Sequence, residues 1–134
     1  MKRVLTIILA LSMHLVHSLA KEQYIFTQVS HKEGFTSTVN CIYKETDGNV
    51  WIGSPAGLYT FDGYNLKHYS DSLLAGRKIY RIEEDVRGNL WVLTDNWPLV
   101  RRKGESSFTL LKLSPEKRTF SSICMDEDVV WMGR

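Results

Sequence analysis

Short apolar segments separated by turn residues run through the chain from about residue 36 to its last residue. After residue 20, no segment keeps apolar side chains at a spacing of about 3.6 residues, which argues against an array of helices. The segments instead have the lengths and the flanking Gly, Asp and Asn residues of short strands joined by tight turns. The predicted strands are Val39–Glu45, Val50–Gly53, Leu58–Phe61, Asn65–Tyr69, Ile79–Glu84, Leu90–Leu93, Leu99–Arg102 and Phe108–Lys112.

This pattern returns along the chain with a period of about 40 residues. The segment Asp47-Gly48-Asn49-Val50-Trp51-Ile52 recurs as Arg87-Gly88-Asn89-Leu90-Trp91-Val92, and in degraded form as Glu127-Asp128-Val129-Val130-Trp131-Met132. The third copy lacks the turn glycine and is one residue shorter between Ile123 and Trp131. Four strands in each repeat of this length are typical of the blades of a β-propeller.

The repeats therefore predict an all-β fold, a partial β-propeller with two four-stranded antiparallel blades and half of a third. The incomplete propeller spans residues 21–134, with a leading outer strand at 24–29, blade 1 at about 36–70, blade 2 at about 76–113 and partial blade 3 at about 118–134. Several strands are apolar without alternation, which predicts that neighbouring sheets cover both of their faces. Trp51, Trp91 and Trp131 are expected to occupy equivalent second-strand positions and to fill the core where their repeats have a neighbour. We expect Trp131 to be more exposed, because the third repeat lacks half of its sheet. Because closed propellers have about four to eight blades, we expect the chain to be a fragment of a longer protein.

The first 20 residues differ in composition from the rest of the chain. Two basic residues precede an apolar run over residues 4–16, and the small residues Ser18 and Ala20 fit the requirement of signal peptidase. We therefore predict that residues 1–20 are a signal peptide, cleaved before Lys21. The alternative is a membrane anchor, but crossing a bilayer takes about 20 apolar residues and this run is shorter.

The charge and the cysteine content give two further expectations, one about binding partners and one about disulfides. The net charge is only +2, and the Lys and Arg residues are dispersed among acidic ones, so we expect neither a nucleic-acid interface nor a membrane-surface patch. Cys41 and Cys124 lie in corresponding segments of the first and third repeats, which a propeller separates by two blades. Since a disulfide needs close Cα atoms, we predict two buried free thiols that pack as small apolar residues.

The first repeat resembles the two-component regulator propeller repeat, whose pattern is carried by the stretch DGNVWIGSPAGLYTFDGYNLKHY. The residues that match the family pattern are Asp47, Gly48, Asn49, Trp51, Ile52, Gly53, Gly57, Leu58, Asp62 and Gly63. The second repeat keeps Gly88, Asn89 and Trp91, but it has Leu93 and Trp97-Pro98-Leu99 where the family has glycine and glycine-leucine.

The resemblance implies the periplasmic sensor region of a Bacteroides-type hybrid two-component histidine kinase. It implies that this fragment senses a ligand, without being an enzyme itself, and that the ligand is an oligosaccharide derived from a polysaccharide. The partner would be the remainder of the parent kinase, a homodimer anchored in the inner membrane, whose span lies outside this fragment. Two alternatives stay open: the N-terminal part of an exported propeller enzyme that acts on polysaccharides, and a freestanding secreted binding protein.

Candidate chemistry along the chain is sparse and points to binding. Trp97 lies in a loop that interrupts the second repeat, and an aromatic ring beside Asn96 and Asp95 suits sugar stacking, so it is the candidate ligand-binding residue. The run Arg101-Arg102-Lys103 is predicted to be a solvated strand edge. The acidic clusters lack the spacing of a calcium loop and no histidine has a neighbour at metal-ligand spacing, so we expect no metal, cofactor or catalytic residue.

We predict that the exported product begins at Lys21, because Ser18 and Ala20 place small residues where signal peptidase requires them. Mass spectrometry of the chain recovered from the periplasm should identify an N-terminal peptide that starts at this residue. An exported chain that retains Met1 would contradict the signal peptide.

Overall fold

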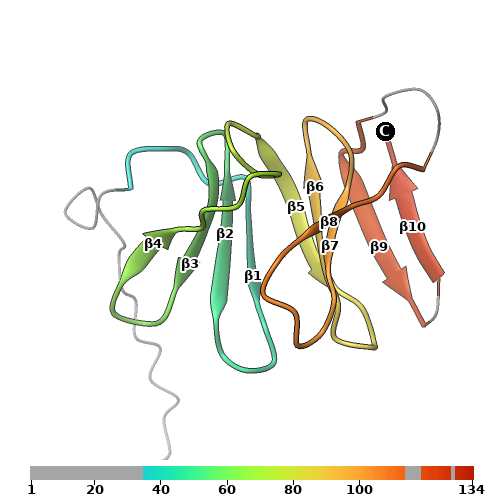
Figure 1. Ribbon diagram of the computed structural model, residues 1–134, viewed down its shortest axis with the longest axis horizontal. Coiled ribbons are helices and arrows are strands. Elements are labelled where there is room, and N and C mark those ends of the chain that lie inside the picture. Colours follow the sequence, from blue (N-terminus) through green and yellow to red (C-terminus); the bar gives the residue numbers. More distant parts are fainter. Residues whose placement is uncertain (1–34, 114–118, 128) are drawn as a thin grey trace, which may run out of the picture.

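The computed structural model describes residues 35–113, 119–127 and 129–134, and these residues form antiparallel strands without a helix (Figure 1). The strands are β1 (Cys41–Lys44), β2 (Val50–Ser54), β3 (Gly57–Phe61), β4 (Leu66–His68), β5 (Ile79–Glu84), β6 (Leu90–Thr94), β7 (Leu99–Arg101), β8 (Thr109–Leu110), β9 (Ser122–Asp126) and β10 (Val129–Gly133). The predicted signal peptide and the predicted leading strand at 24–29 lie outside the described residues.

The strands form three sheets that lie side by side in chain order (Figure 1). Two sheets are four-stranded, β1-β2-β3-β4 and β5-β6-β7-β8, and the third pairs β9 with β10. Strand β5 contacts β1 and β2 on one side and β9 on the other, so neighbouring sheets meet through their first strands. The predicted all-β fold, with two four-stranded blades and half of a third, is confirmed.

The first hairpin turn of each four-stranded sheet has the same hydrogen bonds. The amide of Glu45 donates to the carbonyl of Asn49 at 2.8 Å, and the amide of Asp85 donates to that of Asn89 at 3.0 Å. Gly48 and Gly88 hold φ angles of 99° and 79°, as predicted for these turns. In the third repeat, where that glycine is missing, Glu127 has a φ of 45°.

The three repeat tryptophans occupy equivalent places in the second strand of their sheets. Trp51 pairs with Tyr43, Trp91 with Glu83, and Trp131 with Cys124. In the third hairpin one residue fewer separates the paired positions, as Met132 pairs with Ile123 whereas Ile52 pairs with Ile42. The shortening that the sequence predicts is therefore confirmed.

The expected core position is confirmed for Trp51 and only partly for Trp91, and the greater exposure expected of Trp131 is confirmed. Trp51 is 4% exposed and belongs to the buried cluster, Trp91 is half-buried, and Trp131 is 61% exposed. The physical reason is that each of these side chains lies on the face that the following sheet covers. Trp51 meets a four-stranded sheet, Trp91 meets the two-stranded one, and no described sheet follows Trp131.

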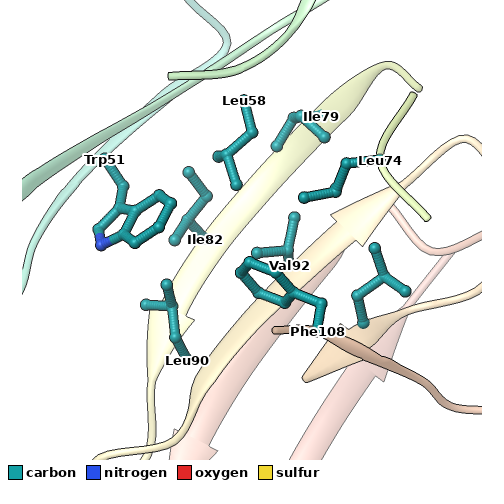
Figure 2. Packing of buried hydrophobic residues seen from close by; sticks show 9 residues of the cluster. Trp51, Leu58, Leu74, Ile79, Ile82, Leu90, Val92 and Phe108 are labelled. Atoms are coloured by element: carbon teal, nitrogen blue, oxygen red, sulfur yellow. The ribbon is translucent and has the colours of Figure 1, made fainter. Parts of the chain in front are cut away.

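The core lies between the first two sheets (Figure 2). Trp51 and Leu58 come from the first sheet and pack against a buried row of the second sheet. The residues of that row are Ile79, Ile82, Leu90, Val92, Leu99 and Phe108, and Leu74 in the connecting loop belongs to the same buried cluster. The ring of Trp51 also meets Tyr69 and Phe108 edge to face, with ring centroids 5.1 and 6.2 Å away. Such aromatic pairs add about 0.5–1.5 kcal/mol beyond their buried area.

Gly53 lets the first two sheets approach each other closely. A Cβ atom added at this position would lie 2.7 Å from Cγ2 of Ile79 in the second sheet and 2.5 Å from Sγ of Cys41. Both distances are well inside van der Waals contact, so a larger residue would push β5 away from β2. The glycine that the family pattern places after Trp-Ile is thus explained by packing between sheets.

Strand β8 contains two residues, whereas the sequence pattern predicted five. Its neighbour Phe108 instead turns into the core, and the amide of Phe108 donates to Oδ2 of Asp71 at 3.3 Å. Phe108 thus lies outside the strand, with its ring packed edge to face on Trp51.

Both described cysteines are free, but only Cys41 fits the predicted packing role. Cys41 is half-buried, and burial raises the pKa of its thiol to about 11. Cys124 is exposed, which contradicts the prediction. Its place in the sheet corresponds to that of Tyr43, so it lies on the same uncovered face as Trp131.

We predict that Trp51→Ala lowers the free energy of unfolding by about 3–5 kcal/mol, because it empties the centre of the packing between the first two sheets. Urea unfolding of the purified exported chain at neutral pH measures this change. The control is Tyr64→Ala, since Tyr64 is 89% exposed in a turn and its loss should change stability by less than about 0.5 kcal/mol. Equal effects of the two variants would contradict the packing described here.

Candidate functional site

A cleft opens between the first two sheets, at the end where their first hairpins turn. Its volume is about 600 Å³, and residues of both hairpins and of the loop after β7 line it. The lining residues are Tyr43, Glu45, Thr46, Asp47, Glu84, Asp85, Val86, Gly88, Arg101, Lys103 and Gly104. We call it the hairpin cleft. Its size lies within the range of about 300–1,000 Å³ that is usual for small-molecule sites.

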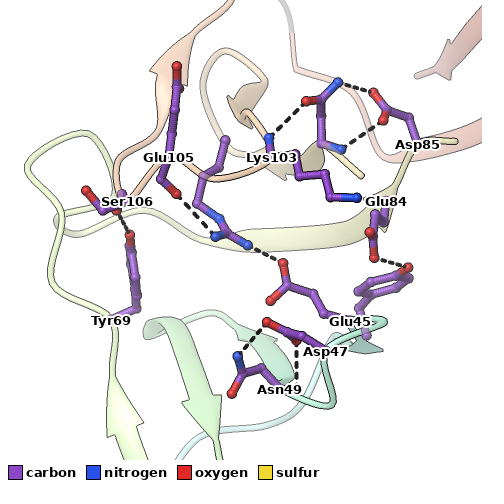
Figure 3. A network of polar contacts seen from close by, with 12 residues as sticks. Glu45, Asp47, Asn49, Tyr69, Glu84, Asp85, Lys103, Glu105 and Ser106 are labelled. Atoms are coloured by element: carbon purple, nitrogen blue, oxygen red, sulfur yellow. Dashed lines mark hydrogen bonds and ion pairs between the residues drawn. The ribbon is translucent and has the colours of Figure 1, made fainter. Parts of the chain in front are cut away.

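An ion pair between the two sheets forms one part of the cleft wall (Figure 3). The guanidinium of Arg101, at the end of β7, donates through Nη2 to Oε1 of Glu45, which follows β1. Both side chains are mostly buried, and the Arg101 guanidinium also lies 5.3 Å from the ring centroid of Trp51. A buried pair of this kind contributes more to fixing the geometry of the two sheets than to stability, because both charges lose water.

The predicted role of Arg101 as part of a solvated edge is therefore wrong. In the second sheet Arg101 pairs with Leu90, and in the first sheet the equivalent partner of Val50 is Phe61. An arginine thus stands where the first repeat has an apolar residue. A position-by-position comparison of the two repeats in the sequence would have shown that Arg101 stands at an apolar position.

A second link between the sheets joins Tyr43 to Glu84. The hydroxyl of Tyr43 donates to Oε2 of Glu84 at 3.0 Å (Figure 3). Burial, together with the hydrogen bond to Glu84 and the negative charge of that side chain, raises the pKa of Tyr43 to about 12. The phenol therefore stays protonated at neutral pH and acts as a donor.

Asp85 organises the hairpin of the second sheet. Its Oδ2 accepts hydrogen bonds from Nε1 of Trp91 and Nδ2 of Asn89, both at 2.9 Å. Its Oδ1 accepts the backbone amides of Arg87 at 3.0 Å and Asn89 at 2.8 Å. Partial burial acts to raise the pKa of Asp85, but these hydrogen bonds outweigh burial and hold the pKa below its usual value.

The first hairpin uses the same backbone turn with a different polar network. Glu45 stands in the place of Asp85 and pairs with Arg101, so Asp47 instead accepts the amide and the side chain of Asn49, each at 3.1 Å. Nε1 of Trp51 is buried and has no hydrogen-bond partner among the described residues. Residues in which the two repeats differ, Glu45 and Asp85 among them, thus line the hairpin cleft.

The other predicted repeat residues have structural roles at the ends of strands. Oδ1 of Asp62 accepts the amides of Asn65 at 2.7 Å and Tyr64 at 2.9 Å, and these bonds lower the pKa of Asp62. Gly63 holds a φ of 96° in that turn. At Gly57, with a φ of 131°, an added Cβ would lie 2.7 Å from Nε2 of His68.

Trp97 lies at the opposite end of the second sheet from the hairpin cleft, in the loop between β6 and β7. Its carbonyl accepts the hydroxyl of Thr94 at 3.2 Å, just as the carbonyl of Gly57 accepts that of Ser54 at 3.0 Å. The side chain is half-buried, and Oδ1 of the neighbouring Asp95 is buried without a hydrogen-bond partner among the described residues. Trp97 lines neither the hairpin cleft nor the cleft between the second and third sheets, and its ligand role stays a prediction.

The second cleft, of about 260 Å³, separates the second and third sheets. It is lined by Asp85, Val86, Arg87, Asn89, Trp91, Arg102, Glu127 and Val130. Across residues 35–113, 119–127 and 129–134, no three His, Cys, Asp or Glu side chains are grouped as metal ligands. The same ranges contain no apolar helix of the length needed to span a bilayer.

Sheets that stack through their first strands, with clefts between successive hairpins, define this chain as part of a β-propeller. Residues 34–56 match the sequence profile of the two component regulator propeller family. The resemblance to this family is confirmed by that match. No match was found among curated proteins.

Two solved structures are similar to the chain, and both are extracellular domains of proteins from B. thetaiotaomicron that are assigned as hybrid two component systems. The first, from BT4673, has a TM-score of 0.62 and 19% identity over 80% of this chain. The second, from BT3049, has a TM-score of 0.55 and 25% identity over 71% of this chain. The chain spans 15% and 13% of the length of these two domains.

We predict that Asp85→Asn destabilises the chain at neutral pH and that the difference from the wild type shrinks in acid. The carboxyl of Asp85 has a lower pKa in the folded chain than the usual value of about 3.9 in an unfolded one. Its stabilising contribution is therefore present above about pH 4 and is lost as the pH falls through the folded pKa. Urea unfolding of both proteins between pH 7 and pH 3 tests this, and a difference independent of pH would contradict it.

Proposed function

We propose that the chain contributes blades to the periplasmic ligand-sensing propeller of a hybrid two-component system. The observation that carries this proposal is the family match over residues 34–56, together with two similar structures that are extracellular domains of such systems. The blades themselves bind the ligand and perform no catalysis. The histidine kinase and the phosphorelay belong to the parent protein.

We propose further that the ligand is derived from a carbohydrate and binds in the hairpin cleft. Sugar hydroxyls need both donors and acceptors, and the cleft offers carboxylates from Asp47 and Glu84 beside the ammonium group of Lys103. The pair of Glu45 and Arg101 fixes the wall behind them, so these groups are held in place before a ligand arrives. A ligand in this cleft touches two blades at once and would stabilise their relative position.

Trp97 is the second proposed place for sugar binding, by stacking of a pyranose ring on its indole. It lies at the other end of the second sheet, so one small ligand does not reach both places. Substitution of one residue at each end therefore separates the two.

The test uses the chain exported to the periplasm and purified, screened against a panel of oligosaccharides and then titrated by calorimetry with the best binder. Glu84→Gln keeps the shape of the cleft but removes a charged acceptor, so it should weaken binding by about tenfold. Tyr64→Ala, in an exposed turn, is the matched control and should bind like the wild type.

Each other outcome has a definite meaning. Loss of binding in Trp97→Ala with normal binding in Glu84→Gln would move the site to the β6–β7 loop. Absence of binding to every oligosaccharide in the panel would overturn the carbohydrate proposal. A membrane span followed by a kinase in the reading frame after Arg134 tests the two-component assignment separately, because that result does not depend on the ligand.

A further inference from the structure

The guanidinium of Arg101 and the indole of Trp51 each have a buried donor without a hydrogen-bond partner among the described residues. These donors are Nε of Arg101 and Nε1 of Trp51. The two groups are neighbours, because Cζ of Arg101 lies 5.3 Å from the centroid of the Trp51 ring. A buried donor without a partner destabilises the fold, so these two donors mark a place where another arrangement of side chains gains hydrogen bonds.

Glu45 is an acceptor that satisfies Arg101 only in part. Oε1 of Glu45 accepts Nη2, whereas Nε, the other donor on the same edge of the guanidinium, has no partner in the described part of the chain. Nη1 of Arg101 donates to the carbonyl of Glu105 at 3.3 Å (Figure 3). Arginine often forms two parallel hydrogen bonds with a carboxylate, so Glu45 occupies the position of an oxyanion incompletely.

The second hairpin indicates another position for the side chain of Glu45. Asp85 stands at the place of Glu45, since the same backbone hydrogen bond closes both turns. Asp85 accepts Nε1 of Trp91 at 2.9 Å, and Trp91 has the same place in its sheet as Trp51. A carboxylate at residue 45 that turns back to its own hairpin therefore accepts Nε1 of Trp51.

Two cations line the hairpin cleft, Arg101 and Lys103. Arg101 pairs with Glu45, but Lys103 forms no ion pair within the described ranges. Asp47 and Glu84, on the same cleft wall, each accept a hydrogen bond from the protein and keep lone pairs for further donors. The cleft thus offers cations for an oxyanion and acceptors for sugar hydroxyls.

We propose that the hairpin cleft binds an acidic sugar, whose oxyanion displaces Glu45 from Arg101, and that Glu45 then turns to Nε1 of Trp51. This inference rests on the proposed carbohydrate site and names the chemical class of its ligand. The oxyanion, a carboxylate or a sulfate, binds the guanidinium and the ammonium group of Lys103. It replaces the charge that Glu45 takes away, so Arg101 is not left unpaired. The link between the two blades then passes through the ligand.

The first test needs no ligand and follows the indole N–H signals of the isotope-labelled, exported chain by NMR. Trp51→Phe identifies the signal of Trp51, and the hydrogen-bonded indole of Trp91 is the internal reference. In Arg101→Met, Glu45 loses its cation, so the Trp51 signal should move downfield towards that of Trp91. Glu45→Asp should cause the same shift, because Asp85 forms this bond with the shorter side chain.

The matched control is the double variant Arg101→Met with Glu45→Ala. It has no acid to accept the indole, so its Trp51 signal should stay where it is in the wild type. Circular dichroism melts verify that each variant folds, and if Arg101→Met does not fold, the conservative Glu45→Asp decides alone. An unchanged Trp51 signal in Glu45→Asp would overturn the exchange of partners, and so would an equal downfield shift in the double variant.

The second test uses calorimetry to compare pairs of oligosaccharides that differ only in their acidic groups. Digalacturonate and galactobiose of the same linkage are one pair, and sulfated galactobiose separates sulfate from carboxylate. The acidic member should bind the wild type at least about tenfold more tightly than the neutral one, since hydrogen bonds to charged groups are the stronger ones. Arg101→Met should lose this preference, and binding to the wild type should move the Trp51 signal downfield.

The outcomes separate this inference from the proposed function. Equal or tighter binding of the neutral sugars would overturn the acidic ligand but leave the carbohydrate site in place. Preference for the acidic sugars without a shift of the Trp51 signal would overturn the displacement of Glu45. Absence of binding by every sugar, acidic or neutral, would overturn the carbohydrate site and the acidic ligand together.

Discussion

The packing of each sheet's tryptophan face on the aliphatic row of the next sheet is the contact on which the structure depends. Several strands are short, since β4 and β7 contain three residues each and β8 contains two. No sheet can bury both of its faces by itself. Stability is therefore a property of neighbouring pairs, as in other repeat proteins. Trp51 is buried because a complete sheet follows it, and Trp131 is exposed although its local sequence and pairing are equivalent.

The polar chemistry depends on this packing in turn. The same hairpin turn appears twice, but Asp85 closes its own hairpin whereas Glu45 reaches the neighbouring sheet and pairs with Arg101. The repeats differ at two places in this network: the first has Glu45 where the second has Asp85, and the second has Arg101 where the first has Phe61. Together, Glu45 and Arg101 therefore form a link between blades in place of a contact within one hairpin. The same link leaves Nε1 of Trp51 without the acceptor that Trp91 finds in Asp85. Glu45 and Arg101, in which the repeats differ, thus line the hairpin cleft.

The local pattern was sufficient to predict the strands and their order, because turn glycines and apolar runs act over a few residues. Strand β5 has the predicted bounds Ile79–Glu84, and Gly48 and Gly88 have the expected positive φ. The predictions that failed concern Cys124 and Arg101. Arg101 pairs with Glu45 of the neighbouring sheet, 56 residues away in sequence, and Cys124 lies on a face that no described sheet covers. A period read from the sequence places a residue on a face but does not show whether that face is covered.

The packing contacts limit which residues are available for the proposed ligand recognition. The residues that define the repeat, such as Asp62, Gly53 and Gly57, are occupied by turn hydrogen bonds or by close contacts, so they form the scaffold and are not free to vary with the ligand. On the proposed sensing role, ligand specificity would come from residues that depart from the repeat. In the described part of the chain these departures gather at the hairpin cleft, with Glu45 and Arg101, and at the β6–β7 loop, with Trp97. Under the proposed function, blades of this type would keep one fold while binding different ligands, because packing depends on one set of positions and recognition would depend on another.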